Sequence, residues 1–275
     1  MRRCSFRLIG LSVMLFALVQ VGCSRGAAQI DENGAQSKEA ITNSGTGSGT
    51  APSPGSSTAA AKSAAVAAVP FTGCNAYYPL VAGSKVSYSI SKPFGQIGAV
   101  TVEVEEAKEK GKKAFTEVSK QMLTRSTTPG TQTTTRKYVC DGDKINVISN
   151  TIESKNPKGV SGQLDGKFPE TATVMIGPSS LTPGATWSYK MDATIKLPDK
   201  PDKKDTFALA FEVRGIEDVT VPAGTFHTVR VGVKVNGKDS DEYYAAGIGL
   251  VRRKLSDGTT WELTDYSGLA PTDKP

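Results

Sequence analysis

Apolar residues recur at every second position along much of the chain, and this period of two is the feature that most limits its fold. The alternation is clear in residues 86–90, 100–104, 187–191, 207–213 and 229–235. A period of two places these side chains on one face of a β-strand and small or polar ones on the other. No stretch of ten or more residues carries a convincing helical stripe. The sequence therefore predicts an all-β domain built as an antiparallel sheet with one buried face.

Glycine and proline separate these runs, and one pair predicts a specific turn. Asn236-Gly237 lies between Val235 and Lys238. Both central residues of a type I′ turn have positive φ, which asparagine and glycine tolerate best. We therefore expect a tight hairpin at this position.

The second part of the domain also resembles the first. Three segments return in the same order: Leu80–Tyr88 as Leu181–Tyr189, Gly111–Val118 as Pro222–Val229, and Tyr138–Gly142 as Tyr243–Gly247. The order favours duplication of a unit of about five strands, with halves near 74–165 and 166–275. The alternative is that turn residues and β alternation produce these similarities by chance.

Residues 24–73 are dominated by Ala, Gly, Ser, Thr and Pro. Such a composition has too little apolar surface to offset the entropy of ordering, so we expect a disordered tether. A flexible coil of this length would reach about 40 Å. The predicted organisation is a signal peptide at 1–22, a lipid-anchored linker at 23–73 and a β domain at 74–275.

The first 24 residues have the pattern of an export signal. Arg2, Arg3 and Arg7 precede a mostly apolar run at 8–19, which is too short to remain as a membrane span. Gly22 then precedes Cys23, and this arrangement resembles a bacterial lipoprotein signal. In that family the cysteine is lipidated and becomes the new N-terminus.

The resemblance implies an address. Cys23 would carry the acyl chains, palmitate among them, that hold the protein on a membrane. Several chains anchor far more firmly than one. Ser24 after the cysteine fits the family pattern for export to the outer membrane, if the host has two membranes. Gln20 stands where the family usually has leucine, and an ordinary signal peptide cut near Ala27-Ala28 is the alternative.

If Cys4 leaves with the signal and Cys23 is the lipid site, two cysteines remain in the exported domain, Cys74 and Cys140. An oxidising envelope favours a disulfide between them. In the chain-entropy treatment a loop of this length stabilises the fold by roughly 4 kcal/mol. Two free thiols or a metal site are the alternatives.

The charge pattern gives little support to nucleic-acid binding. The formal net charge is +6, and removal of Arg2, Arg3 and Arg7 with the signal halves it. The remaining charges mostly alternate in sign, without a stripe of arginines between exposed aromatic residues.

Three motifs in the second half of the domain resemble a broad class of secreted bacterial proteins of unknown function. They are Leu181–Tyr189, Val221–Phe226 and Tyr243–Val251. The resemblance implies one long antiparallel sheet that curves into a half-open barrel. Outer-membrane lipoprotein carriers share this shape. The resemblance implies a fold and a cellular location, without an assured activity.

Groups suited to catalysis are scarce. His227 is the single histidine, and its register with Val229 predicts a half-buried sheet residue rather than a general base. The acidic residues after Asn236-Gly237, which are Asp239, Asp241 and Glu242, are more typical of a solvated turn than of a calcium site. Trp187 and Trp261 are expected to fill the core, with an aromatic ligand shelf as the alternative.

These observations predict a non-catalytic envelope lipoprotein, without cofactor or metal, that binds an apolar ligand, a lipid or a protein partner through its curved sheet. One alternative is a hydrolase of cell wall or polysaccharide, which needs two carboxylates about 5 to 10 Å apart across a cleft. Another is a structural module on the surface of an envelope assembly.

Overall fold

The computed structural model describes residues 73–125, 129–159 and 161–271. The predicted signal peptide, Cys23 and the linker up to residue 72 lie outside them. The elements are β1 Lys85–Lys92, β2 Gly95–Glu109, β3 Lys112–Leu123, β4 Gly130–Asp141, β5 Lys144–Lys155, β6 Ser161–Lys167, β7 Thr173–Met175, a 3₁₀ turn at Pro178–Ser180, β8 Thr186–Lys196, β9 Lys203–Val221, β10 Gly224–Val235, β11 Lys238–Ala245, β12 Gly249–Leu255 and β13 Thr260–Ser267.

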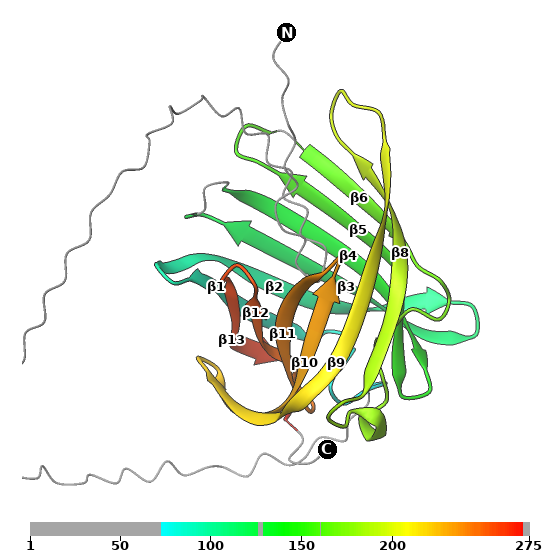
Figure 1. Cartoon of the computed structure of the whole chain (residues 1–275), viewed down its shortest axis with the longest axis vertical. Coiled ribbons are helices and arrows are strands. Elements are labelled where there is room, and N and C mark those ends of the chain that lie inside the picture. Colours follow the sequence, from blue (N-terminus) through cyan, green and yellow to red (C-terminus); the bar gives the residue numbers. More distant parts are fainter. Residues whose placement is uncertain (1–72, 126–128, 160, 272–275) are drawn as a thin grey trace, which may run out of the picture. The chain divides into compact units, whose positions relative to one another are not determined.

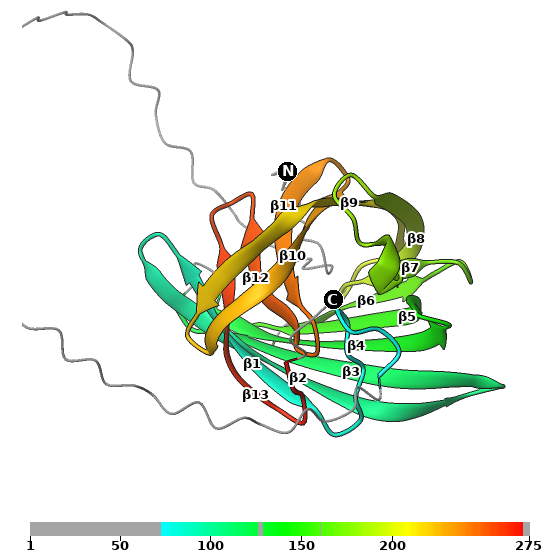
Figure 2. The ribbon, with the colours of Figure 1, turned by 90° about the horizontal axis from the view of Figure 1, so that it is seen from below.

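Twelve of the thirteen strands in this part of the chain form one closed ring of antiparallel pairs. Each strand from β1 to β6 pairs with the next, β6 pairs with β8, and β8 to β13 continue in the same way. β13 then pairs with β1, which closes the ring. The short β7 is added to one end of β5. The ring can be followed through both views (Figure 1, Figure 2).

This topology confirms the predicted all-β fold and its curved antiparallel sheet. The curvature goes further than the expected half-open barrel. Pairing of β13 with β1 leaves neither strand with a free edge, so the backbone groups on both sides of each strand are engaged. The ring encloses an interior space, called the lumen below.

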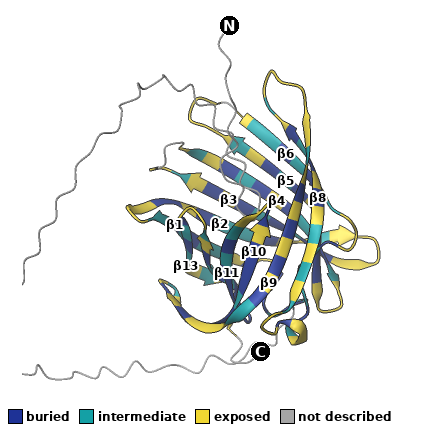
Figure 3. Ribbon diagram, viewed as in Figure 1, coloured by how far each residue is buried: buried dark blue, intermediate teal, exposed yellow. Residues whose placement is uncertain are grey.

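The predicted alternation is visible in the burial of the longest strand. In β9, Phe207, Leu209 and Phe211 are buried, whereas Ala208 and Ala210 between them are exposed (Figure 3). The valines of β10 at 229, 231, 233 and 235 are buried as well. These side chains form the apolar wall of the lumen, because a strand places every second residue on the same face.

The hairpin between β10 and β11 has the predicted turn. Asn236 and Gly237 both have positive φ, 47° and 82°, and Val235 pairs directly with Lys238. The sequence signal for this register is therefore confirmed.

The segment before β1, Cys74–Ser84, closes one end of the lumen and is called the strap below. It has no regular structure, yet Tyr77, Tyr78 and Leu80 are buried. Cys74 forms a disulfide with Cys140 at the end of β4, with Cα atoms 5.8 Å apart.

Side-chain and backbone hydrogen bonds hold the strap in place. The amide of Asn75 donates to the carbonyls of Asp143 and Ile176 at 2.8 and 2.9 Å. The carbonyl of Ala76 accepts from the backbone N–H of Gly247 at 2.8 Å. The strap therefore contacts the β4–β5 turn, the segment after β7 and the β11–β12 turn.

The buried apolar residues divide into two clusters. The larger contains the strap and the lumen side of β8 to β10. The smaller contains β1, β12 and β13 with the tip of the β9–β10 hairpin, where Val219 and Phe226 are buried. The N–H of Ala223 in this tip donates to the carbonyl of Leu263 at 3.1 Å, which ties the tip to β13.

Among the residues that the structure describes, no helix has the length and apolar character needed to cross a membrane.

Candidate functional site

Two strands of the first half send polar side chains into the barrel. On β3 the buried residues include Glu117, Ser119 and Gln121, and on β4 they include Thr134 and Arg136. Each set follows the period of two, so all of these side chains lie on the inner face. Buried charged groups are costly unless they are paired, and their partners define the site.

Glu117 and Arg136 form the first buried ion pair. Arg136 Nη1 donates to Glu117 Oε1 at 2.7 Å, with side chains 8% and 10% exposed. The hydroxyl of Tyr78, from the strap, donates to Glu117 Oε2 at 3.3 Å and lies 2.8 Å from the hydroxyl of Tyr138. Burial lowers the pKa of Arg136, but Tyr138 and Glu117 outweigh this and raise it, so the guanidinium stays charged.

Glu242 and Arg253 form a second pair from β11 and β12. Arg253 Nε lies 2.8 Å from Glu242 Oε1, and the side chains are only 1% and 3% exposed. Tyr244 donates its hydroxyl to Glu242 Oε2. The guanidinium of Arg253 also lies over the ring of Trp261, 4.7 Å from its centre. A cation on a desolvated indole face is favourable and offsets part of the burial cost.

This second pair differs from the first in one respect. The contact between Arg253 and Glu242 has the distance of an ion pair without the alignment of a hydrogen bond. Arg253 Nη1 is buried and has no hydrogen-bond partner among the described residues. By contrast, Arg136 has no buried polar atom without a hydrogen-bond partner among the described residues.

Both arginines face one cavity of about 80 Å³. Its walls come from the strap, from β1 to β4 and from β11 to β13. The apolar lining consists of Pro79, Leu80, Val86, Val102, Val104, Ile248, Leu250, Trp261 and Leu269, and the polar lining includes Glu117, Ser119, Thr134, Arg136 and Arg253. Val86, Val102, Leu250 and Leu269 are only partly buried. The cavity is therefore amphipathic, and partly buried apolar residues form its rim.

The tyrosines around the cavity are neutral hydrogen-bond donors. Burial raises the pKa of Tyr78, Tyr88 and Tyr138 well above the ordinary value of a phenol, because the charged form would be desolvated. Tyr88 donates to the carbonyl of Leu250 at 2.9 Å. These groups fix the walls of the cavity and do not supply protons for chemistry near neutral pH.

Neighbouring side chains hold the two lumen carboxylates, Glu117 through hydrogen bonds to both oxygens and Glu242 through one hydrogen bond and one ion pair. Arg136 and Tyr78 engage the two oxygens of Glu117, and Arg253 and Tyr244 engage those of Glu242. A general acid or base must reach the reacting atom. The arrangement gives the hydrolase hypothesis no supporting geometry.

His227 lies far more exposed than predicted. Its side chain is 63% exposed, and Nδ1 lies 2.8 Å from Asp218 Oδ1 across the β9–β10 hairpin. The prediction of a half-buried residue was wrong, because near the tip of this hairpin the buried positions of β10 are Phe226 and Thr228, on either side of His227.

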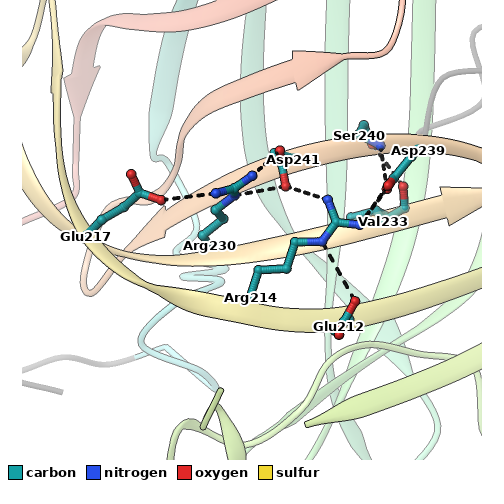
Figure 4. Close-up of polar contacts among 8 residues, drawn as sticks. All are labelled: Glu212, Arg214, Glu217, Arg230, Val233, Asp239, Ser240 and Asp241. Carbon is teal, nitrogen blue, oxygen red and sulfur yellow. Dashed lines mark hydrogen bonds and ion pairs between the residues drawn. The ribbon is translucent and has the colours of Figure 1, made fainter. Parts of the chain in front are cut away.

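The three acidic residues predicted to form one group point to two different faces of the sheet. Asp239 and Asp241 point to the outer face, whereas Glu242 points into the lumen. Arg214 binds both aspartates at 2.8 Å, and Arg230 binds Asp241 at 2.7 Å (Figure 4). Gly232 makes room for this network, because a Cβ there would collide with the guanidinium of Arg214. Within the described residues, no group of three or more His, Cys, Asp or Glu is placed to hold a metal ion.

The two tryptophans have different environments. Trp261 is 5% exposed and packs in the smaller cluster, as predicted for a core residue. Trp187 is half-buried and stacks on Phe211, with ring centres 5.0 Å apart and planes 4° from parallel.

Sequence reasoning did not find the two ion pairs. The strands that carry Glu117 and Arg136 have polar residues at their inward positions, so neither face showed an apolar alternation. One signal was present: neighbouring residues of a strand point to opposite faces, which separates Glu242 from Asp241.

Comparison with known proteins places the whole barrel in one family. The match covers residues 82–267, which extend from before β1 to the end of β13. The chain belongs to the DUF3108-like family. The buried ion pairs and the cavity of this DUF3108-like protein all lie on or beside the matched segment.

No curated protein matches the chain significantly. Two solved structures are similar to it. One is a protein from Parabacteroides distasonis, provisionally named a lipoprotein, with 12% identity and a TM-score of 0.44 over 70% of this chain and 99% of that one. The other is a protein from Bacteroides fragilis, provisionally named as exported and described with a YmcC-like fold. It has 13% identity and a TM-score of 0.44 over 70% of this chain and 100% of that one.

Proposed function

We propose that this DUF3108-like protein is a non-catalytic lipoprotein of the cell envelope whose barrel binds a small, largely apolar ligand in its lumen. The observation that carries the proposal is the amphipathic cavity of about 80 Å³ inside the ring of strands. Binding sites for small molecules typically combine apolar walls with a few convergent polar groups. The engaged carboxylates of Glu117 and Glu242 favour binding over catalysis.

The size of the cavity limits the ligand. An apolar cavity of about 150 Å³ accommodates benzene, so about 80 Å³ holds only part of a larger molecule. The rest would lie along the apolar rim of Val86, Val102, Leu250 and Leu269. A slender molecule with one end enclosed fits this shape.

The sequence supplies the proposed location. Lipidation of Cys23 would hold the barrel on the outer membrane of a host with two membranes, at the end of the linker. In this arrangement the barrel stays near a lipid surface and retains access to the surrounding compartment.

Native mass spectrometry of the full chain, purified from its host in mild detergent, tests ligand binding. We expect a mass above that of the lipidated chain, which denaturation reduces to the bare value. Val102→Trp should abolish the added mass by filling the rim. Val118→Trp, on the outer side of β3, is the matched control and should retain it. A bare mass for the wild-type chain would contradict the proposal.

Metabolic labelling with palmitate tests the anchor separately. We expect label on the wild-type chain and on Cys4→Ser, and none on Cys23→Ser, which should also leave the membrane fraction. Equal labelling of Cys23→Ser would show that the anchor is wrongly placed without affecting the cavity.

A further inference from the structure

Arg253 is the most deeply buried charged side chain around the cavity. It is 1% exposed, and its Nη1 has no hydrogen-bond partner in the part of the chain that the structure describes. A buried guanidinium N–H without an acceptor is unfavourable, because its lost hydration is not replaced. Arg253 also lines the cavity, so a molecule in the cavity can supply the missing acceptor.

The groups around Arg253 select the chemistry of that molecule. The cavity presents donors in Arg253 Nη1 and in the hydroxyls of Ser119 and Thr134. Glu117 is the one carboxylate among the described residues of its lining, and both of its oxygens accept hydrogen bonds, from Arg136 and Tyr78. A ligand head that only accepts hydrogen bonds is therefore favoured over one that must donate. A carboxylate accepts from arginine through charge-assisted bonds, which are the strongest of this kind.

The remaining walls select the other end of the ligand. Apolar residues surround the approach to Arg253, among them Val86, Val102 and Leu250. Among the described residues that line the cavity, the charged ones are Glu117, Arg136 and Arg253, and all three belong to the two ion pairs. A single acidic head on an aliphatic chain matches this distribution.

We propose that the cavity binds an aliphatic monocarboxylate, with its carboxylate against Arg253 and its chain along the apolar rim. This inference rests on the proposed function and specifies its ligand class. It assigns to Arg253 the role of the residue that recognises the head of the ligand. Glu242 and Trp261 position Arg253, through the ion pair on one side and the ring face on the other.

Calorimetric titration of the full chain with hexanoate and with 1-hexanol tests the inference. The two probes have the same chain length and differ in the head. A hydrogen bond to a charged group predicts that hexanoate binds about tenfold to hundredfold more tightly. Lengthening the acid should tighten binding about three- to fourfold per methylene while the chain still lies on the rim.

A double variant, Arg253→Met with Glu242→Leu, removes the head site and leaves no buried charge unpaired. Such replacements of a buried pair often preserve stability. The preference for hexanoate over 1-hexanol should disappear. Arg252→Met with Glu262→Leu is the matched control, because that pair joins β12 to its other neighbour, β13, at 2.8 Å on the outer face. Its preference should be unchanged.

The outcomes separate the two proposals. Equal affinity for both probes would overturn the role of Arg253 and leave ligand binding intact. A preference for hexanoate that survives in the Arg253 and Glu242 variant would overturn it too. If neither probe binds and the native mass is bare, the proposed function fails with it. If circular dichroism shows that the double variant does not fold, titration of the wild-type chain with hexanoate and 1-hexanol still tests the role of Arg253.

Discussion

The third strand of each half of the barrel shows how far the two halves differ inside. In β10, the third strand of the run β8 to β13, the buried positions include Val229, Val231 and Val233. In β3, the third strand of the run β1 to β6, they include Glu117, Ser119 and Gln121. Strands at the same place in the two runs therefore form an apolar wall in one run and a polar wall in the other.

The turns at the start of the two runs are nevertheless the same. Gly83 N–H donates to Val104 O at 2.8 Å, and Gly184 N–H donates to Val213 O at 2.8 Å. In both turns, the backbone N–H of the residue after the glycine donates to the carbonyl of the residue two positions before the glycine. These bonds run from Ser84 to Val81 and from Ala185 to Thr182. Both glycines have positive φ, 81° and 89°. Each run has six strands, one more than the repeat pattern predicted.

These shared turns support the predicted duplication, which stays a prediction. The comparison teaches that the backbone of this barrel tolerates different interiors. Turns and strand pairing are set by residues that look alike in both halves, whereas the chemistry of the lumen is set by side chains that do not. The cavity lies where β1 to β4 meet β11 to β13, so it takes its polar groups from the divergent positions.

The largest effect should come from breaking the polar wall. Arg136→Leu leaves Glu117 buried without its cation, and we expect the free energy of unfolding to fall by about 3 to 5 kcal/mol. Urea denaturation followed by circular dichroism measures the loss. Adding Glu117→Leu should recover most of it, because no unpaired charge then remains.

The effect of adding Glu117→Leu decides whether the ion pair explains the loss of stability. In the apolar wall, Leu209→Ala should cost about 2 to 5 kcal/mol, and truncating Phe211 as well should increase the loss. Rescue by a second change belongs only to the polar wall. If the Arg136 and Glu117 double variant is no more stable than Arg136→Leu alone, the ion pair does not explain the cost.

The strap distinguishes the halves covalently. Its disulfide joins Cys74 to the first half at Cys140, whereas the position aligned with Cys140 in the second half is Ala245. Replacing both cysteines with serine should lower the free energy of unfolding by about 2 to 4 kcal/mol. It should also expose Tyr78 and Leu80, which amide hydrogen exchange would detect in residues 74–84.

Cys4→Ser is the control for this experiment, because Cys4 belongs to the predicted signal peptide and takes no part in the bridge between Cys74 and Cys140. Fast exchange confined to the strap is the expected pattern. Uniformly faster exchange in β8 to β13 would instead mean that the bridge stabilises the ring as a whole.

The sequence indicated the strands best where one face was apolar. The sets in β8, β9 and β10 were predicted from alternation alone, as was the turn at Asn236-Gly237. The polar wall escaped this reasoning, because inward residues such as Glu117 and Thr134 look like the solvent face of an ordinary strand. Burial of such residues depends on partners from other strands, which the local pattern does not contain.

Closure of the ring was missed for a related reason. It depends on pairing between β1 and β13, whose residues Ser87 and Thr264 are 177 positions apart and linked by a 3.1 Å hydrogen bond. Alternation reports which face of a strand is buried, and it does not report which strand lies alongside. The strap was missed because its buried tyrosines follow no period.

The shared turns offer a smaller and cleaner comparison. Gly83→Ala and Gly184→Ala each force a Cβ into the left-handed region, and neither Cβ would meet another atom within 4 Å. Both should therefore lower the free energy of unfolding by about 1 to 2 kcal/mol, through the backbone alone. Urea denaturation of the two variants measures the costs side by side.

Equal costs would support the view that the same turn occurs at the start of both runs of strands. Ala82→Gly, next to the first turn, is the control for a change in chain flexibility. If the costs of Gly83→Ala and Gly184→Ala differ by more than about 1 to 2 kcal/mol, which is the full penalty expected for one substitution, the two turns are not equivalent.

The smallest effect concerns the charges on the outer face of the second half. Burial raises the pKa of Asp241, but hydrogen bonds from Arg230 and Arg214 outweigh it and hold that pKa below its usual range. A carboxyl whose folded pKa is depressed stabilises the fold above its unfolded pKa of about 3.9, and this stability is lost as the pH falls through the folded pKa. Asp241→Asn should cost about 1 kcal/mol at pH 7, kept small by solvent screening.

The cost of Asp241→Asn should therefore shrink as unfolding is measured at progressively lower pH, from 7 to below 4. Asp265→Asn, at an exposed position of β13, is the matched control and should change stability little at any pH. The buried pair of Glu117 and Arg136 is inside the barrel, whereas Asp241 has one side to solvent, so salt should weaken only the Asp241 effect. A cost for Asp241→Asn that is independent of both pH and salt would assign its role to packing rather than to charge.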